Sequence, residues 1–179
     1  MARDPRYDVL FEPIDIGSKT ARNRFWQTPH CNSAGSDRPG TQAAFRGMKA
    51  EGGWGTVSVE YTNIHPEADD APHCAGLMWD EGDVISFRHV TDSIHKHGSL
   101  AGVQLYYAGL HAQCGESRAV SRAPSAAPSE AIPLASVHEM DADDIRAVIQ
   151  MHVDAAKRSR DAGFDLIEIQ GAHGYLVHE

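Results

Sequence analysis

Side chains that could carry chemistry recur directly after short apolar runs. They include a thiol beside an imidazole at Cys31 and His30, and amides, phenols and further imidazoles after the later runs. A thiolate can act as a nucleophile or hold a cofactor covalently, and a nearby positive charge lowers its pKa. Amides, imidazoles and phenols supply both donors and acceptors for a polar ligand. The four groups are Pro29-His30-Cys31, Glu60-Tyr61, Gln104-Tyr106-Tyr107 and Gln170-His173-Tyr175.

The apolar runs that precede these groups have the length and composition of strands buried in a parallel sheet. Helical patterns separate them, and each pattern ends at glycine. The helix before the last run is the clearest, with Asp141 as its N-cap and a stop at Gly163. The predicted strands are 24–28, 56–61, 100–106 and 165–170, and the predicted helices are 41–51, 83–97 and 142–162.

This alternation predicts an α/β fold, with parallel strands joined by right-handed crossovers. Four such strands are about half of a (β/α)8 TIM barrel, which needs roughly 250 residues. We therefore expect residues 1–179 to be the N-terminal part of a barrel domain, truncated after its fourth strand. The alternative is a half-barrel whose open edges a partner covers. Segment 117–136, rich in Ser, Ala and Pro, predicts a long surface loop after the third strand.

In a barrel of this kind the C-terminal ends of the strands form the active site. The four groups of polar residues are therefore expected to meet at one mouth. Each residue alone has a simpler explanation, because strand ends lead into loops and loops are polar. Cys31 in particular could be an inert buried cysteine rather than a nucleophile or a cofactor tether.

Composition and spacing exclude several other classes of protein. The chain has 179 residues with 16 Lys and Arg against 25 Asp and Glu, which argues against binding to nucleic acid or an anionic membrane. No apolar run approaches about 18 residues, so no spanning helix is predicted. The charged N-terminus lacks the apolar stretch of a signal peptide, so we expect a cytoplasmic protein.

Neither a disulfide framework nor a metal site is expected. The cysteines Cys31, Cys74 and Cys114 form no close pair, and no Cys-x-x-Cys motif occurs. The glycine-rich stretch 52–55 precedes a strand instead of following one, which is the wrong order for a dinucleotide-binding turn.

Several segments resemble the old yellow enzyme family, also called the NADH:flavin oxidoreductase family, of FMN-containing TIM barrels. Residues 10–17 and 22–25 resemble the N-terminal segment of that family, and residues 163–169 and 171–176 resemble the family's fourth-strand signature. Other segments are most similar to the branch with trimethylamine, dimethylamine and histamine dehydrogenases. Those segments are 1–11, 27–31, 49–54, 79–83 and 154–165.

The resemblance implies roles for particular residues around FMN. It assigns Cys31 to a covalent bond with carbon 6 of the flavin, with Thr28, Pro29 and His30 beside it. Other relatives have a cysteine here that only contacts the flavin, so both possibilities stay open. Gln104 matches a residue that reaches the pyrimidine edge of the ring, where an amide can both donate and accept.

On the substrate side, the resemblance assigns catalytic positions to His173, Tyr175 and Gln170. His173 lines the substrate face, and Tyr175 matches the proton-donor tyrosine of ene-reductases. Gln170 departs from the family, because the amine dehydrogenases have a tyrosine there and an amide does not titrate. Tyr61 matches an aromatic wall that attracts a tertiary ammonium by a cation–π contact.

The resemblance therefore implies a flavin-dependent dehydrogenase acting on a small amine, with a tertiary or bulky amine favoured. The amine would become an iminium that water hydrolyses to an aldehyde and a dealkylated amine. A 4Fe-4S cluster, and ADP, would lie outside residues 1–179, electrons would pass to an electron-transferring flavoprotein, and the full-length enzyme would be a homodimer. Two alternatives remain: an ene-reductase or 2,4-dienoyl-CoA reductase that uses NAD(P)H, and a non-catalytic fragment.

Overall fold

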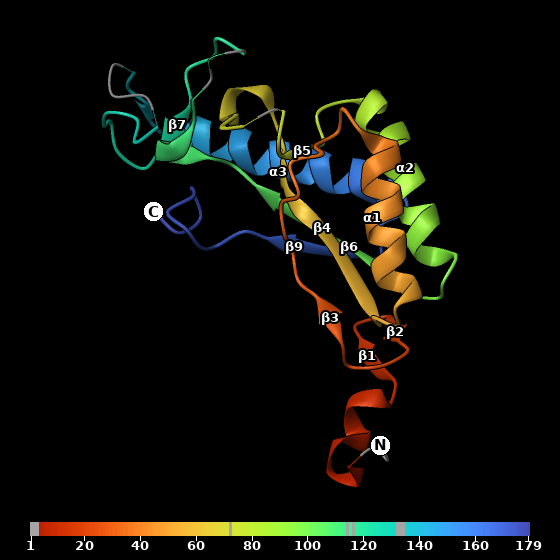
Figure 1. Cartoon of the computed structure of the whole chain (residues 1–179). Helices are drawn as coiled ribbons and strands as arrows, with labels where there is room; N and C mark the ends of the chain where they lie inside the picture. Colours follow the sequence, from red (N-terminus) through yellow and green to blue (C-terminus); the bar gives the residue numbers. More distant parts are fainter. Residues whose placement is uncertain (1–3, 72, 114, 116, 132–134) are drawn as a thin grey trace.

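A parallel sheet forms the centre of the chain. The computed structural model describes residues 4–71, 73–113, 115, 117–131 and 135–179. The main strands follow the order β3-β4-β6-β9, each parallel to the next, and the short strand β5 pairs with β4 (Figure 1). Neighbours in the sheet follow chain order, which confirms the predicted barrel-like progression. The strands are β3 Trp26–Gln27, β4 Thr56–Asn63, β5 Gly76–Leu77, β6 Leu100–Tyr106 and β9 Leu166–Ile169.

Strand β9 is shorter than predicted by one residue at each end, and strands β3 and β4 differ from the prediction for local reasons. Strand β3 is shorter than 24–28, because the Asn23 side chain accepts from the Phe25 amide before the strand begins. Strand β4 continues two residues past Tyr61, because Thr62 and Asn63 pair with both β6 and β5. The pairing with β5 was not expected from the sequence.

Three helices connect the main strands and cover one face of the sheet. Asp141 caps the third helix as predicted, and its side chain accepts from the amides of Asp143 and Asp144. The second helix begins before Asp83, because Asp80 is its N-cap in the same kind of capping box. The first begins at Pro39, a residue with the backbone angle that a first helical turn requires. The helices are α1 Pro39–Glu51, α2 Glu81–His95 and α3 Ala142–Asp161.

The hydrophobic core lies between these helices and the sheet. Val57 and Val59 of β4, and Val103 and Leu105 of β6, point toward the helices and are fully buried. Phe87 of α2 packs against them in the same cluster. Alternate strand residues therefore face the opposite side of the sheet, where the polar residues lie.

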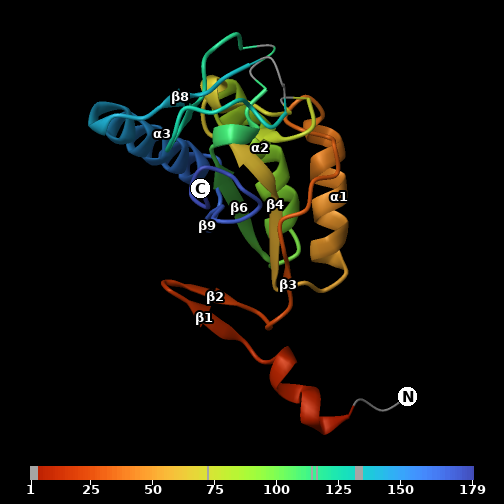
Figure 2. The same ribbon diagram turned by 90° about the vertical axis from the view of Figure 1, so that its left-hand side faces the viewer.

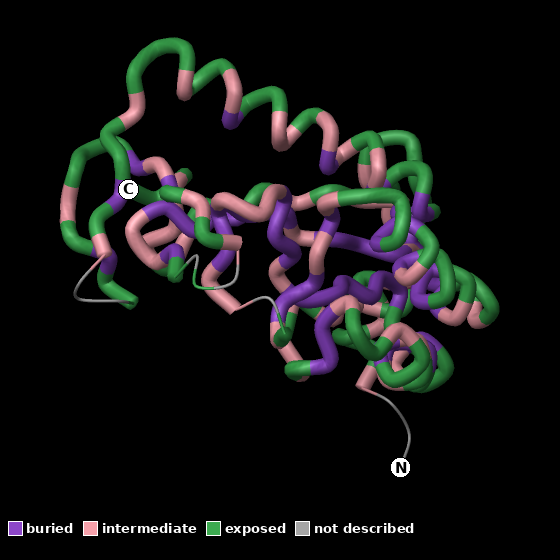
Figure 3. Tube along the Cα trace, turned by 90° about the horizontal axis from the view of Figure 1, so that it is seen from above, coloured by how far each residue is buried: buried purple, intermediate pink, exposed green. Residues whose placement is uncertain are grey.

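Much of the apolar face of α3 remains exposed. On this face Val148 is buried, but Ile145 and Ile149 are 48% and 58% exposed. They line an apolar groove of about 390 Å³ together with Ile169 of the edge strand β9. In Figure 3 the tube of α3 carries few buried positions among exposed and intermediate ones.

Two outlying parts complete the described chain. The 3-10 helix Pro5–Phe11 and the antiparallel hairpin of β1 Ile14–Ile16 and β2 Lys19–Ala21 lie below the sheet (Figure 2). The remaining short elements lie on loops after β4 and β6. They are the 3-10 helices Pro66–Ala68 and Gly109–His111, with β7 Arg122–Ala123 and β8 His138–Glu139.

The segment predicted as a surface loop is more ordered than expected in its described part. Strand β7 pairs with β8, so the segment is folded back against the start of α3. Ser121 and Ser129 are buried, and the Ser129 hydroxyl donates to the Ala112 carbonyl.

Asp165 joins four elements at the N-terminal end of the sheet. Its carboxylate accepts from Lys19 Nζ at 2.8 Å, from His95 Nε2 at 2.7 Å and from the Ala101 amide at 2.9 Å. Burial alone would raise the pKa of this carboxyl, but the three hydrogen bonds outweigh it and the pKa lies below its usual range. The same contact with Asp165 raises the pKa of His95.

We predict that Asp165→Asn lowers the free energy of unfolding by about 2 kcal/mol at pH 6. At this pH, Asp165 is ionised in the folded and in the unfolded protein, and His95 is charged in the folded protein. Because the folded state depresses the pKa of Asp165, its contribution is present above about pH 4 and is lost as the pH falls through the folded value. Urea unfolding from pH 6 down to pH 3 should therefore show the wild-type advantage shrinking. Asp161→Asn, at the exposed end of α3, is the matched control, and an equal loss there would contradict the assignment.

Candidate active site

The carboxyl ends of the main strands converge on one pocket. We call it the strand-end pocket; it has a volume of about 280 Å³. Residues after β3, within β4 and β6, and after β9 all contribute, as the barrel prediction requires. Thr28 is exposed and does not line it. The lining residues are Pro29, His30, Cys31, Tyr61, Gln104, Gln170, His173 and Tyr175.

A β-bulge in β4 decides which side chains face the pocket. Ser58 pairs with Gly102 and Tyr61 pairs with Gln104, so β4 advances by three residues over a stretch in which β6 advances by two. Strict alternation from Val57 and Val59 would aim Tyr61 at the helices. The extra residue turns Tyr61 to the pocket side and turns Glu60 toward α1.

Glu60 forms a fully buried ion pair with Arg46 of α1. Arg46 Nη2 lies 2.9 Å from Glu60 Oε2, and both side chains are 0% exposed. Arg46 also donates to the His30 carbonyl at 2.5 Å and to Gln27 Oε1 at 3.0 Å, and Gln42 donates to the other oxygen of Glu60. The pair therefore ties α1 and β4 to the segment that carries Cys31.

Sequence reasoning missed this network, although a signal was present. Gln42, Arg46 and Ala50 are spaced four residues apart, so they share one stripe of α1, and Ala50 lies in the core. Polar residues on a buried helical stripe require buried partners. Glu60, inside an otherwise apolar strand, is the residue that such a search would have found.

Cys31 carries a half-buried free thiol at the pocket. Its Sγ lies 3.4 Å from the Cys74 carbonyl and 3.4 Å from the Ser33 amide. Burial, with a smaller contribution from the Glu60 charge, raises the pKa of the thiol despite the Ser33 amide. Arg46 is the nearby cation that could have lowered it, but Glu60 already neutralises that charge. The protein surroundings therefore hold Cys31 as a thiol.

Gln170 and His173 form a hydrogen-bonded pair. Gln170 Nε2 lies 3.2 Å from His173 Nδ1, so with the amide nitrogen assigned to this contact Nδ1 accepts and the ring proton lies on Nε2. His173 has a positive φ of 61°, a conformation that costs a non-glycine residue energy and is concentrated at functional sites. The hydrogen bond with Gln170 orients this imidazole.

Aromatic rings form a wall of the pocket. The Tyr61 and Tyr175 rings are close to parallel, with centroids 6.1 Å apart at 19°. Tyr106 packs against both of them, at 4.7 Å and 4.9 Å. A wall of phenol faces suits a cationic ligand, because the ring face carries negative potential.

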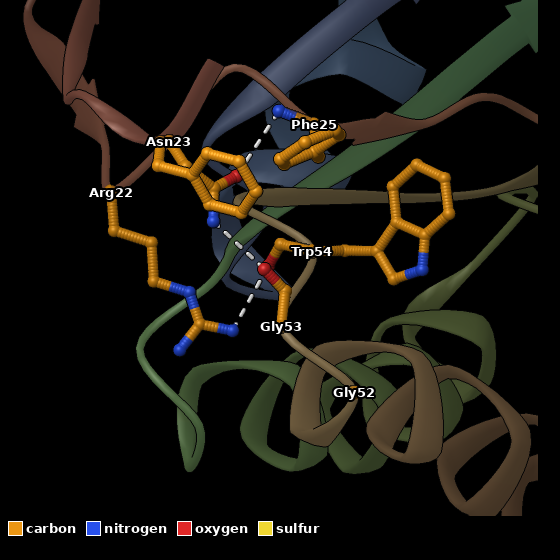
Figure 4. A pocket seen from close by; sticks show the side chains of 7 residues that line it. Arg22, Asn23, Phe25, Gly52, Gly53 and Trp54 are labelled. Carbon is orange, nitrogen blue, oxygen red and sulfur yellow. Dashed lines mark hydrogen bonds between the residues drawn. The ribbon is translucent and has the colours of Figure 1, made fainter. Parts of the chain in front are cut away.

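A larger cavity of about 550 Å³ lies at the opposite end of the strands (Figure 4). We call it the basal cavity; Phe11, Arg22, Asn23, Phe25 and Trp54 line it with Gly52 and Gly53. Its polar groups already serve the fold: Arg22 donates to the carbonyls of His97, Ala50 and Trp54, and Asn23 donates to Gly53. The reactive residues all lie at the other end, so the smaller pocket is the candidate site.

The described residues offer neither a cluster of metal ligands nor a membrane-spanning helix. Within that part of the chain, no group of three or more His, Cys, Asp or Glu side chains is placed to hold a metal ion. None of its helices combines the length and the apolar character needed to cross a membrane. Cys114 lies outside the described residues.

Comparison with known proteins identifies the family. A model of the NADH:flavin oxidoreductase / NADH oxidase family matches residues 9–179. The chain belongs to this family. Within the family it is 51% identical to dimethylamine dehydrogenase of Hyphomicrobium sp. (strain x), over 98% of this chain and 25% of that protein.

Solved structures of related proteins agree with the fold. Histamine dehydrogenase from Rhizobium sp. 4-9 superposes with a TM-score of 0.93 at 42% identity, over 98% of this chain and 27% of the other. Old Yellow Enzyme from Pichia sp. AKU4542 superposes with a TM-score of 0.85 at 26% identity, over 94% of this chain and 47% of the other. The fold is thus that of the family's TIM barrels, and the chain spans about a quarter of the amine dehydrogenases it matches.

The pocket residues fit a flavin ring. Gln104 provides both a donor and an acceptor at the edge of the pocket, and the Cys31 thiol and the Pro29–His30 backbone line another side. The lining contains no lysine or arginine, so a phosphate group would be held elsewhere, and TIM barrels place such sites after strands 7 and 8.

We predict that Arg46→Met and Glu60→Gln each lower the free energy of unfolding by about 3 kcal/mol, because each leaves a buried group without its partner. The double variant should lose less than the sum, since it removes the charge and its counter-charge together. Urea unfolding in a double-mutant cycle measures this coupling. Lys19→Met, which removes the half-exposed partner of Asp165, is the control and should cost about 1 kcal/mol or less. Fully additive losses would contradict the ion pair.

Proposed function

We propose that this chain forms the N-terminal part of the FMN barrel of a flavin-dependent amine dehydrogenase. The observation that carries the proposal is the strand-end pocket itself. It brings together Cys31, Gln104, His173 and Tyr61 from four strand ends, in a family member 51% identical to a dimethylamine dehydrogenase. Bound FMN would supply the acceptor for the two electrons that leave the amine.

Cys31 and Gln104 are the proposed flavin contacts of this chain. Because the surroundings keep Cys31 as a thiol, a covalent link depends on an electron-poor ring placed against it. The thiol proton and the hydrogen of the ring carbon would be lost as the carbon–sulfur bond forms, and the two electrons left on the flavin would pass to the acceptor that also takes electrons after amine oxidation. The link would prevent loss of the flavin. Gln104 would hydrogen-bond the pyrimidine edge, where an amide tolerates the charge that arrives on reduction. Arg46 acts indirectly, since it fixes the carbonyl of His30, the residue before the thiol.

His173 and the tyrosine wall are the proposed substrate contacts. His173, held by Gln170, presents its Nε2 proton, and Tyr61 offers an aromatic face worth about 0.5–2 kcal/mol to a cation. The aromatic wall supports a tertiary or bulky amine as the substrate. Oxidation next to the nitrogen would give an iminium, and water would hydrolyse it to an aldehyde and a dealkylated amine.

The proposed path of the electrons after the flavin involves groups outside residues 1–179. We propose a 4Fe-4S cluster and ADP in the larger polypeptide, and an electron-transferring flavoprotein as the acceptor. The resemblance to the amine dehydrogenases, which are about four times as long as this chain, supports this part of the proposal.

We predict that small amines, and not NAD(P)H, bleach the flavin of the intact, flavin-loaded protein in an anaerobic titration. Trimethylamine and dimethylamine are the amine probes, and NADPH with cyclohexenone tests the ene-reductase alternative. Bleaching by NADPH alone would favour that alternative. A correctly folded protein without any flavin would favour a non-catalytic role and would contradict the proposal.

We predict that acid precipitation leaves yellow colour with the wild-type polypeptide and that Cys31→Ala releases it into the supernatant. Cys74→Ala is the matched control, because Cys74 is also a half-buried free thiol but does not line the pocket. Flavin in the wild-type supernatant would contradict the covalent link, while leaving the contact with Cys31 intact.

A further inference from the structure

Asp70, outside the strand-end pocket, holds the hydroxyl group of a residue that lines it. Tyr175 donates from its hydroxyl to Asp70 Oδ2 at 3.2 Å, and Tyr106 donates to Oδ1. The carboxylate thus uses one oxygen for each phenol. Asp70 lies on the loop after β4 and does not itself line the pocket.

The direction of these hydrogen bonds follows from the chemistry of the groups. An ionised carboxylate only accepts, so both phenols must donate to it. Burial raises the pKa of Asp70, and the hydrogen bonds from Tyr106 and Tyr175 oppose that rise. Burial, followed by the Asp70 charge, raises the pKa of Tyr175, so this phenol keeps the proton that it donates.

The proton of Tyr175 is therefore turned away from the pocket. A phenol has one O–H, and once it points at Asp70 the oxygen can only accept from a ligand. Tyr106 packs against Tyr175 with ring centroids 4.9 Å apart and holds the ring in this position. At the Tyr175 hydroxyl, a ligand that accepts, such as a carbonyl oxygen, finds no donor, whereas an N–H group finds an acceptor.

We propose that Asp70 is a positioning residue that determines specificity: by fixing Tyr175 as an acceptor, it makes the pocket select a substrate nitrogen that carries an N–H. Primary and secondary amines and protonated tertiary amines meet this condition, and quaternary ammonium ions do not. The inference rests on the proposed amine dehydrogenase function and deepens it. The cation–π wall alone attracts both kinds of cation, because it requires positive charge and no N–H group.

Trimethylammonium and tetramethylammonium separate the two contributions, because both are cations at pH 7 and only the first has an N–H. Their dissociation constants are measured by calorimetry on the intact flavin-loaded protein, reduced anaerobically with dithionite so that no oxidation can follow. The wild type should bind trimethylammonium about tenfold more tightly, the size of one hydrogen bond from a charged donor.

In Asp70→Asn that ratio should fall toward one, because the amide no longer offers two acceptors to the two phenols. Tyr175→Phe, which removes the hydroxyl altogether, should give the same loss and provides a second route if the first variant folds poorly. Asp154→Asn, on the exposed surface of α3, changes the charge equally and should keep the wild-type ratio.

A wild-type ratio near one, or an unchanged ratio in Asp70→Asn or Tyr175→Phe, would overturn the inference. An equal fall in Asp154→Asn would overturn it as well, since general charge would then explain the effect. These outcomes can be distinguished from a failure of the proposed function. If amines bleach the flavin but the protein binds the two cations equally well, only the role of Asp70 is refuted. If amines do not bleach the flavin, the proposed function is refuted.

Discussion

One extra residue in β4 determines the chemistry of both sides of the sheet. The bulge between Ser58 and Tyr61 turns Tyr61 to the strand-end pocket and Glu60 to the helix side. Without it, Tyr61 would enter the apolar layer and Glu60 would lose its contact with Arg46. The buried ion pair then fixes the His30 carbonyl, and with it the segment that bears Cys31. The thiol and the aromatic wall are thus placed by the same local irregularity.

The sequence predicted the parts of the structure that follow from periodicity. Strand β6 was predicted with its observed ends, because residues 100–106 form a short, mostly apolar run and Gly98 marks the preceding turn. The N-cap at Asp141 was equally clear, since the carboxylates that follow it suit the first helical turn. Convergence of the strand ends follows from parallel topology, so the cluster of pocket residues was predictable without coordinates.

The features that sequence reasoning missed depend on contacts between distant residues. A bulge has no signature in the run 56–62, where polar and apolar residues alternate and all but the half-buried Tyr61 are buried. The exposure of Ile145 and Ile149 could not be foreseen from helical spacing, because spacing shows which residues share a face and not what covers it. The orientation of the Tyr175 hydroxyl depends on Asp70, 105 residues earlier in the chain.

A crystal structure of the flavin-loaded protein tests the central claim most directly. We expect electron density for the isoalloxazine ring in the strand-end pocket, with Gln104 at its edge, Cys31 Sγ within bonding distance, and His173 with Tyr61 over one face. A ring bound in the basal cavity beside Phe11 and Trp54, or placed away from Cys31 and Gln104, would contradict the account.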